Sequence, residues 1–105
     1  MNILNIMKQV GELQAKMKVA QAELETLEFA GESGGGLVKV IVSGKSDLRK
    51  ISIDKSLLKK SEVEILEDLI VAAHADAKLK VNAATADKMS TVTAGLPIPP
   101  GMKLF

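Results

Sequence analysis

Apolar residues recur every three or four positions over the first quarter of the chain. This spacing places them at the a and d positions of four heptads, a pattern typical of a helix with a narrow apolar seam. Asn2, just ahead of the pattern, can cap the helix start. A narrow seam packs on another helix, either within the chain or in a second copy, and the sequence leaves both open. The seam residues are Ile3, Ile6, Val10, Leu13, Met17, Ala20, Leu24 and Leu27.

The middle of the chain alternates between apolar and polar positions, which is typical of strands. The first alternation is short, and we predict a strand over residues 26–31, the alternative being a last turn of the helix. Val38, Val40 and Val42 then share one face of a second strand. Residues 48–54 form a third run, and the short glycine-containing connection before it predicts an antiparallel hairpin.

A second long helix is predicted after residue 60. Ser61 and Glu64 form the S-x-x-E pattern of a capping box, and apolar residues continue at helical spacing through Ala77. Beyond Ala77 the helix becomes less hydrophobic, which indicates an exposed extension that projects past the sheet. Three prolines in residues 95–105 cannot continue a helix, so we expect an extended C-terminal tail there, after a single α+β domain over residues 1–94.

Composition narrows the classes of partner. The chain has 105 residues, enough for one domain, and 47% of them are hydrophobic, which argues against a disordered chain. Its only aromatic residues are Phe29 and Phe105, which argues against RNA or single-strand readers that stack bases on aromatic rings. Lys and Arg total 14 against 13 acidic residues, so a nucleic-acid partner requires lysines gathered on one surface. No apolar run approaches the ~20 residues of a membrane span, and the N-terminus does not have the pattern of a signal peptide.

The glycine-rich middle segment raises the question of a nucleotide site. A phosphate-binding loop has the pattern G-x-x-x-x-G-K-[ST] between a strand and a helix. Gly31 and Gly36 have the glycine spacing, but Leu37 stands where the lysine is needed. Gly44 begins a Gly-Lys-Ser triplet, but Lys39 stands where the first glycine is needed. Both segments also lead into predicted strands, so we interpret these glycines as a loop and a hairpin turn.

Catalytic and metal-binding patterns are weak. The chain has no cysteine and one histidine, His74, so neither a thiolate site nor a His-His metal site can form within one chain. The carboxylates of residues 62–68 lie in the expected first turns of a helix, where they suit the positive end of its dipole. We therefore expect no enzymatic activity, no cofactor, no metal and no small-molecule substrate.

Five segments, in this order and at this spacing, resemble the YbaB/EbfC family of bacterial nucleoid-associated proteins: MKQVGELQAKMKVAQAELE (7–25), GGGLVKVIVSGK (34–45), ISID (51–54), LEDLIVAAHADA (66–77) and GLPIPPGM (95–102). The resemblance implies an α-β-β-β-α domain with a three-stranded antiparallel sheet and two long helices. It also implies a homodimer whose long helices project as arms, a location in the cytoplasm at the nucleoid, and binding to double-stranded DNA that changes its conformation. The chain departs from the family at His74 and Ala75, where an aromatic residue and Asn are typical, so no role of that Asn carries over.

Within that resemblance, the lysines of the two helices are the candidate DNA-binding residues. Their ammonium groups would neutralise phosphates and release counterions, with little reading of base sequence. Lys39 and Lys45 on the hairpin are candidates for minor phosphate contacts. A second hypothesis is a protein–protein interaction module without a direct DNA function, which the near-neutral charge and the heptad-bearing helix favour. The candidate DNA-binding lysines are Lys8, Lys16, Lys18, Lys78, Lys80 and Lys88.

Overall fold

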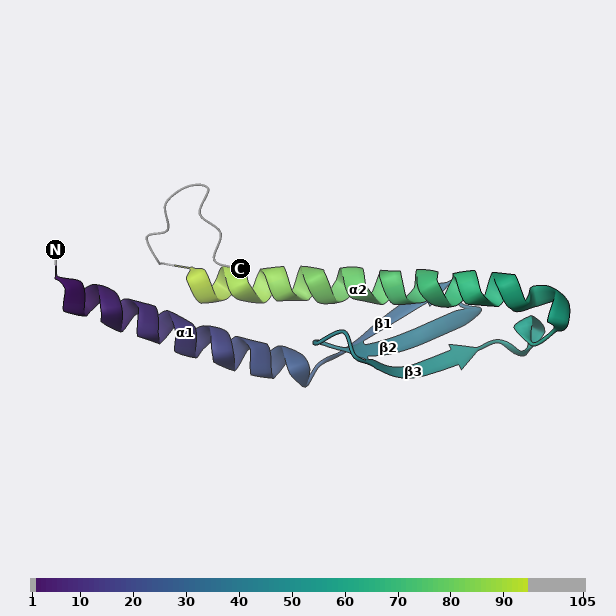
Figure 1. Ribbon diagram of the computed structural model, residues 1–105, viewed down its shortest axis with the longest axis horizontal. Helices are drawn as coiled ribbons and strands as arrows, with labels where there is room; N and C mark the ends of the chain where they lie inside the picture. Colours follow the sequence, from purple (N-terminus) through teal and green to yellow (C-terminus); the bar gives the residue numbers. More distant parts are fainter. Residues whose placement is uncertain (1, 95–105) are drawn as a thin grey trace.

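Two long helices are joined through a three-stranded sheet in the computed structural model, which describes residues 2–94 (Figure 1). This order confirms the predicted α-β-β-β-α arrangement of an α+β fold. The tail predicted over residues 95–105 lies outside the described residues. In chain order the elements are α1 (Ile3–Glu25), β1 (Glu28–Ser33), β2 (Val38–Ser43), β3 (Leu48–Ile53), the 3₁₀ turns η1 (Lys55–Leu57) and η2 (Lys60–Glu62), and α2 (Val63–Thr93).

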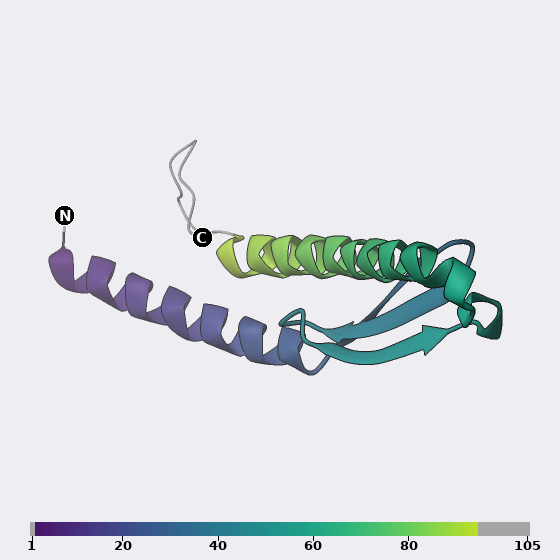
Figure 2. The same cartoon turned by 45° about the vertical axis from the view of Figure 1, so that its right-hand side comes forward.

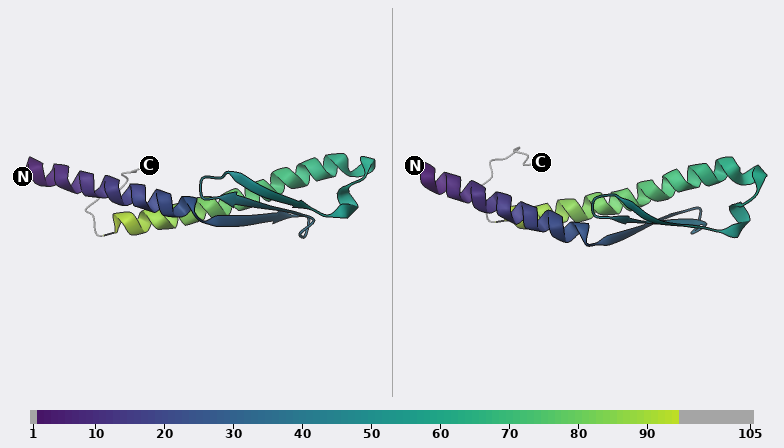
Figure 3. Two further views of the ribbon diagram at one scale, coloured as in Figure 1. Left: turned by 90° about the horizontal axis from the view of Figure 1, so that it is seen from below. Right: turned by 60° about the horizontal axis from the view of Figure 1, so that its bottom comes forward.

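The sheet is antiparallel throughout, with β2 in the centre and β1 and β3 at the edges. Helix α2 packs on one side of it, and Figure 3 shows the strands running beside only part of this helix. Val38, Val40 and Val42, which the alternation placed on one face, are all buried. They form the core together with Ala73 and Ala77 of α2, so the predicted hairpin and its valine face are confirmed.

Strand β1 begins two residues later than the sequence predicts. The backbone N–H groups of Thr26 and Leu27 donate to carbonyl oxygens of the last helical turn, at 3.2 and 3.0 Å. Because these amides close the end of α1, pairing with β2 starts only at Glu28. Leu27, counted as the last seam residue, therefore lies outside the helix and is exposed.

Helix α2 crosses β1 very closely because the residues at the crossing are small. A Cβ atom placed on Gly31 would run into the carbonyl oxygen of Ala73 and lie 2.7 Å from the Cβ of Ala77. A larger residue at 31 would push the helix off the strand, since close-packed backbones cannot yield cheaply. The glycine that began the apparent phosphate-loop pattern is thus a packing residue.

The glycine run between β1 and β2 forms a tight loop. Gly34, Gly35 and Gly36 all have positive φ, at 61°, 68° and 96°, a region that residues with a Cβ rarely adopt. Gly44 lies in the turn between β2 and β3, as predicted. Neither segment leads into a helix N-terminus, so neither can bind a nucleotide phosphate in the way a phosphate-binding loop does.

The two helices run antiparallel and overlap along only part of their lengths (Figures 1 and 2). Ala20 and Leu24 are buried on the α1 side of this overlap. The expectation that α2 is simply exposed beyond Ala77 is wrong for one of its faces, where Val81 and Met89 are buried. Val81 belongs to the sheet core, and α1 covers the turns of α2 around Met89.

Beyond the overlap, α1 continues alone. Helix α2 ends at Thr93, close to Ala15 and Lys16, so residues 3–14 extend past it; we call them the α1 overhang. The molecule measures 68 × 26 × 16 Å, and its Cα radius of gyration is 19.4 Å. A compact domain of this length would have a radius of gyration of about 13 Å. The described chain is therefore elongated, and within residues 2–94 its heptad seam packs on α2 in one half and is uncovered in the other.

One predicted helix cap forms and the other does not. The side chain of Asn2 accepts the backbone N–H of Leu4 at 3.0 Å, as predicted. Ser61 and Glu64 do not form a capping box, because Ser61 lies inside the turn η2 rather than at the helix boundary. The residue at the N-cap of α2 is Glu62, whose side chain makes no capping hydrogen bond.

Candidate nucleic-acid interface

The six candidate lysines divide between two ends of the molecule. We call α1 together with residues 82–93 of α2 the arm, and the three strands together with residues 63–81 of α2 the sheet end. No single surface carries all six candidates. Lys8, Lys16, Lys18 and Lys88 lie on the arm, and Lys78 and Lys80 lie at the sheet end.

Lys80 is held by strand β1. Its ammonium group donates to the carbonyl oxygen of Ala30 at 2.6 Å and lies 3.8 Å from the carboxylate of Asp76, one helical turn earlier. That carboxylate in turn accepts the backbone N–H of Glu32 at 3.0 Å. The two side chains thereby occupy backbone groups on the free edge of β1, where another strand could otherwise pair. We therefore interpret Lys80 mainly as a residue that stabilises the fold, and only to a smaller extent as a phosphate ligand.

Lys88 forms an ion pair with Glu23 across the two helices of the arm. The two side chains are 38% and 54% exposed, so the pair is worth only about 0.2–1 kcal/mol in water. A phosphate can therefore compete for this lysine at little cost, although Glu23 reduces the positive charge around it.

The other four candidates make no ion pair with any residue that the structure describes. Their directions nevertheless differ. A helix turns by about 100° per residue, so Lys16 and Lys18 point to nearly opposite sides of α1. Lys78 and Lys80 are likewise two residues apart on α2. Because Lys80 contacts β1, Lys78 points away from that strand. A duplex on one side of the arm can therefore contact only some of these lysines in each chain.

A groove of about 420 Å³ lies between the overlapping parts of α1 and α2. Lys16 and Lys88 contribute to its lining, together with the apolar side chains of Val19 and Val92. Ala94, the last described residue, lines it as well. Apolar side chains do not bind phosphates. Of the residues that line this groove, only the lysines could therefore contact the DNA backbone.

A second group of basic residues runs from the β2–β3 turn through β3 to η2, and of these only Lys45 is among the residues that the sequence suggests for phosphate contacts. Between residues 45 and 60, six exposed basic residues stand against Asp47 and Asp54. The backbone N–H of Ser56 donates to Asp54 at 2.9 Å, and hydrogen bonding by Ser56 lowers the pKa of this carboxyl group. The local excess of basic residues in the sequence is the signal that identifies this group. Its basic residues are Lys45, Arg49, Lys50, Lys55, Lys59 and Lys60.

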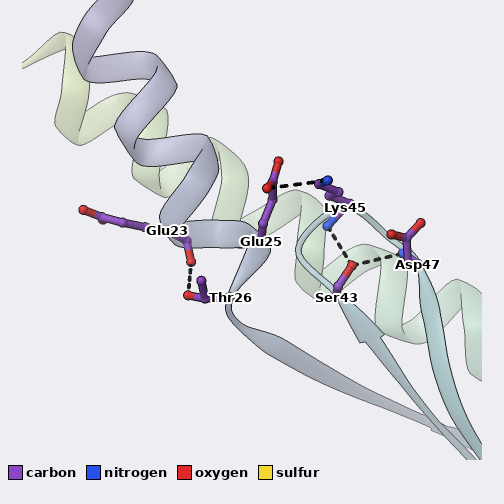
Figure 4. Close-up of polar contacts among 6 residues, drawn as sticks. All are labelled: Glu23, Glu25, Thr26, Ser43, Lys45 and Asp47. Carbon is purple, nitrogen blue, oxygen red and sulfur yellow. Dashed lines mark hydrogen bonds and ion pairs between the residues drawn. The ribbon is translucent and has the colours of Figure 1, made fainter.

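Of the two hairpin lysines proposed as minor contacts, Lys45 is already engaged (Figure 4). Its ammonium group lies 3.5 Å from the carboxylate of Glu25 at the end of α1. The hydroxyl of Ser43 accepts the backbone N–H groups of Lys45 and Asp47, at 3.2 and 3.3 Å, and so fixes the turn. Lys45 therefore helps to hold the hairpin against α1, whereas Lys39 is simply exposed on β2.

Part of the sheet face that packs on α2 is left uncovered. Helix α2 contacts β1 and β2 extensively, whereas β3 packs mainly on β2. Ile51 and Ile53 pair with two of the buried valines and share their face, yet they are 39% and 36% exposed. His74 lies on this side of α2, because it is about 200° around the helix from Asp76, which faces β1. Together with the exposed Leu48, these isoleucines form an open apolar face, which we call the β3 face.

Residues 2–94 offer neither a metal-binding cluster nor a membrane-spanning helix. That part of the chain contains no group of three His, Cys, Asp or Glu side chains placed to hold a metal ion. None of its helices is both long and apolar enough to cross a bilayer. Glu64 lies in the first turn of α2, where a negative charge complements the helix dipole.

Comparison with known proteins agrees with the segment-by-segment resemblance. Residues 1–96 match the YbaB/EbfC DNA-binding family. A nucleoid-associated protein of Brucella ovis is 59% identical over 103 residues, which cover 98% of this chain and 96% of that protein. A nucleoid-associated protein of Brucella anthropi is 58% identical over the same shares. The crystal structure of an uncharacterized protein from Helicobacter pylori shows the same fold, with a TM-score of 0.73 at 21% identity over 83% of this chain and 91% of that one.

Proposed function

The chain belongs to the YbaB/EbfC DNA-binding family, and from that premise we propose that it binds double-stranded DNA as a nucleoid-associated protein in the cytoplasm. The observation that carries the proposal is the match to this family over residues 1–96. The arm supports it, because Lys8, Lys16 and Lys18 are exposed and make no ion pair within the described part of the chain. These ammonium groups can reach phosphates without breaking an internal contact.

The interaction we propose is neutralisation of phosphates, with release of the counterions that screen them. Base reading plays a small part, because the commonest specific contact uses Arg, and the only Arg of the chain, Arg49, lies on β3. Lys78 adds to the surface from the sheet end, whereas Lys80 and Lys88 contribute less because each already has an internal partner. Binding should therefore depend strongly on salt and weakly on sequence.

Fluorescence anisotropy of a labelled duplex, titrated at several salt concentrations, tests this proposal. The logarithm of the binding constant should fall linearly with the logarithm of salt, by about 0.9 for each phosphate contact. Two duplexes of unrelated sequence should give similar constants. Absent binding at low salt, or binding that salt does not weaken, would contradict the proposal.

We also propose that the protein is a homodimer in which a second copy covers the β3 face. Leu48, Ile51 and Ile53 together expose apolar area beside the core, and covering such area stabilises an assembly by about 25 cal/mol per Å². A chain of this size buries only part of its apolar surface alone, which adds to the case for a partner. Such a dimer would carry two arms.

Sedimentation at micromolar concentration tests the dimer. Ile51→Lys should shift the equilibrium toward monomer, because it places a charge on the β3 face. Ser52→Lys introduces the same charge on the other face of the same strand and should leave the dimer intact. A wild-type chain that sediments as a stable monomer would refute this part of the proposal.

Two arms on one dimer can contact a duplex at two places, so they can clamp it or bridge two segments. We therefore propose that binding changes the conformation of DNA. Energy transfer between dyes at the two ends of a duplex should change when the protein binds. Tight binding with unchanged transfer would show that the duplex keeps its shape.

The second candidate, a protein–protein interaction module, is favoured by the net charge of +1 and by the bare half of the heptad seam. Purification from the native host at low salt separates the two. Salt-sensitive retention of DNA is expected for the first candidate, whereas a stoichiometric protein partner without such retention would favour the module. The family is DNA-binding and not a known enzyme family, and we propose no catalytic activity.

A further inference from the structure

The α1 overhang carries an apolar seam that no described residue covers. Ile3, Ile6 and Val10 follow one another at heptad spacing and are 71%, 42% and 49% exposed. Leu4 and Met7 widen the seam and are more than half exposed. Deeper along α1 the same seam packs on α2, so the overhang continues a packing face beyond the end of its partner helix (Figure 2).

The chain leaves α2 at the inner end of this bare seam. Helix α2 ends at Thr93, and Ala94 lines the groove between the helices beside Ala15 and Lys16. The last described residue therefore lies at the groove, next to the first uncovered turn of the overhang.

The remaining chain is long enough to cover the overhang. Eleven residues follow Ala94, and as a polyproline II segment they would span about 34 Å. The twelve residues 3–14 of the overhang are about 18 Å long as a helix. A tail that runs from the groove along α1 therefore reaches the helix start with chain to spare.

The chemistry of the tail suits an apolar surface. Its one charged residue is Lys103, so it brings little charge onto the seam. Its three prolines restrict the free chain, which reduces the entropy lost on docking, and they have no N–H group that would need a partner beside apolar side chains. The large apolar residues of the tail are Leu96, Ile98, Met102, Leu104 and Phe105.

We propose that residues 95–105 dock along the bare seam of the α1 overhang of their own chain. In this arrangement Ile98 lies near Met7. Ile98 is four residues beyond Ala94, about 12 Å along an extended chain. Met7 is eight residues before Ala15, about 12 Å along the helix. The tail takes over the packing role of α2 where α2 stops, and it stiffens the part of the arm that carries Lys8.

The tail of the same chain is favoured over a second copy because it is tethered at the end of the seam. A short tether raises the effective concentration of the docking segment to roughly millimolar, which a second chain at micromolar concentration does not match. This docking is independent of DNA binding, so its tests are made without DNA.

Disulfide trapping in the full-length chain tests the docking, since the chain has no cysteine of its own. We compare Met7→Cys/Ile98→Cys with Asn5→Cys/Ile98→Cys, using oxidised glutathione; Asn5 is at a similar height but about 200° around the helix from Met7 and on the side away from the bare seam. The first pair should form an intramolecular disulfide at least about tenfold faster, because docking holds one thiol at a high local concentration and the other away from it. Equal rates for the two pairs would overturn the proposal.

Mixing single-cysteine chains identifies the occupant. Chains carrying Met7→Cys and chains carrying Ile98→Cys should not form a covalent heterodimer faster than chains carrying Asn5→Cys and Ile98→Cys do. A fast heterodimer would show that the seam is covered by the tail of a second copy, which would overturn docking within one chain.

Hydrogen exchange gives an independent reading. Ile98→Asp should release the tail and accelerate exchange of the amides of residues 6–14, whereas Lys103→Asp places the same charge at a polar position and should not. Exchange in the overhang that is unchanged by Ile98→Asp would overturn the proposal, even if the trapped disulfide forms.

Discussion

The sheet end and the arm are built from similar small and aliphatic residues, yet they pack differently. At the sheet end, Val38, Val40 and Val42 are at most 1% exposed, and Gly31 lets α2 lie directly on β1. Along the arm, contact between the helices is confined to their overlap, and the overhang then continues uncovered by any described residue. The comparison indicates that the two regions have different roles. The packed core of the sheet end stabilises the fold, whereas the arm extends away from that core and leaves its side chains open to a partner.

The charges follow the same division. At the sheet end, Lys80 and Asp76 are used to close the free edge of β1. On the arm, Lys8, Lys16 and Lys18 have no such task within the described residues. A lysine without an internal partner can bind a phosphate without breaking an existing contact. We therefore expect DNA to bind along the arm.

The largest expected effect is the loss of the close crossing at the sheet end. Gly31→Ala should lower the free energy of unfolding by about 3 kcal/mol, because the added Cβ meets the backbone of α2 and cannot be relieved by a side-chain rotation. Gly35→Ala is the matched control, with φ of 68° and no atom within 4 Å, and strain alone should cost about 1 kcal/mol. Urea unfolding at one protein concentration measures both. Equal losses would mean that the crossing is not tightly packed.

A smaller effect should separate two lysines that lie two residues apart on α2. Lys80→Met should lower the free energy of unfolding by about 0.5–1 kcal/mol, because it removes the hydrogen bond to Ala30 and a half-exposed ion pair. It should leave the salt dependence of DNA binding nearly unchanged. Lys78→Met should do the opposite, changing stability by less than about 0.5 kcal/mol and reducing the salt slope by about 0.9. If Lys80→Met flattened the slope more than Lys78→Met, the boundary drawn between structural and DNA-binding lysines would be wrong.

The smallest expected effect is a gain in stability, in contrast to the losses expected above. Gly11 lies in the middle of the overhang, and a Cβ added there meets nothing within 4 Å. Gly11→Ala should therefore stabilise the helix locally by about 0.5–1 kcal/mol, since glycine loses more backbone freedom in a helix. Slower hydrogen exchange of the neighbouring amides would show it, whereas faster exchange would mean that the overhang is not held as a continuous helix.

The sequence predicts those parts of the fold that depend on neighbouring residues, and it fails where distant or competing contacts decide the structure. The period of two in Val38, Val40 and Val42 was sufficient to predict a buried strand face, because it depends only on neighbouring residues. The start of β1 was predicted two residues early, since the amides that close α1 decide it. The capping box at Ser61 failed for a similar reason, because a 3₁₀ turn occupies the position where the pattern places the helix start.

The candidate site was less predictable than the fold. Lysines on the two helices could be found from the sequence, but their availability depends on partners far along the chain. Lys80 meets Ala30, 50 residues away, and Lys88 meets Glu23. The sequence also did not predict which half of the heptad seam α2 leaves uncovered, because the heptad pattern of α1 does not show where α2 ends.

The most direct test of the arm as the DNA-binding surface is to remove equal charge from the arm and from the basic segment that leads into α2. Lys8→Ala/Lys16→Ala/Lys18→Ala and Lys55→Ala/Lys59→Ala/Lys60→Ala each remove three positive charges, from the arm and from the basic segment leading into α2. Anisotropy titrations across salt should show the arm variant with a slope smaller by about 0.9 for each lysine that contacts a phosphate, and the other variant with the wild-type slope. An equal or greater reduction in the second variant would contradict the arm as the DNA-binding surface.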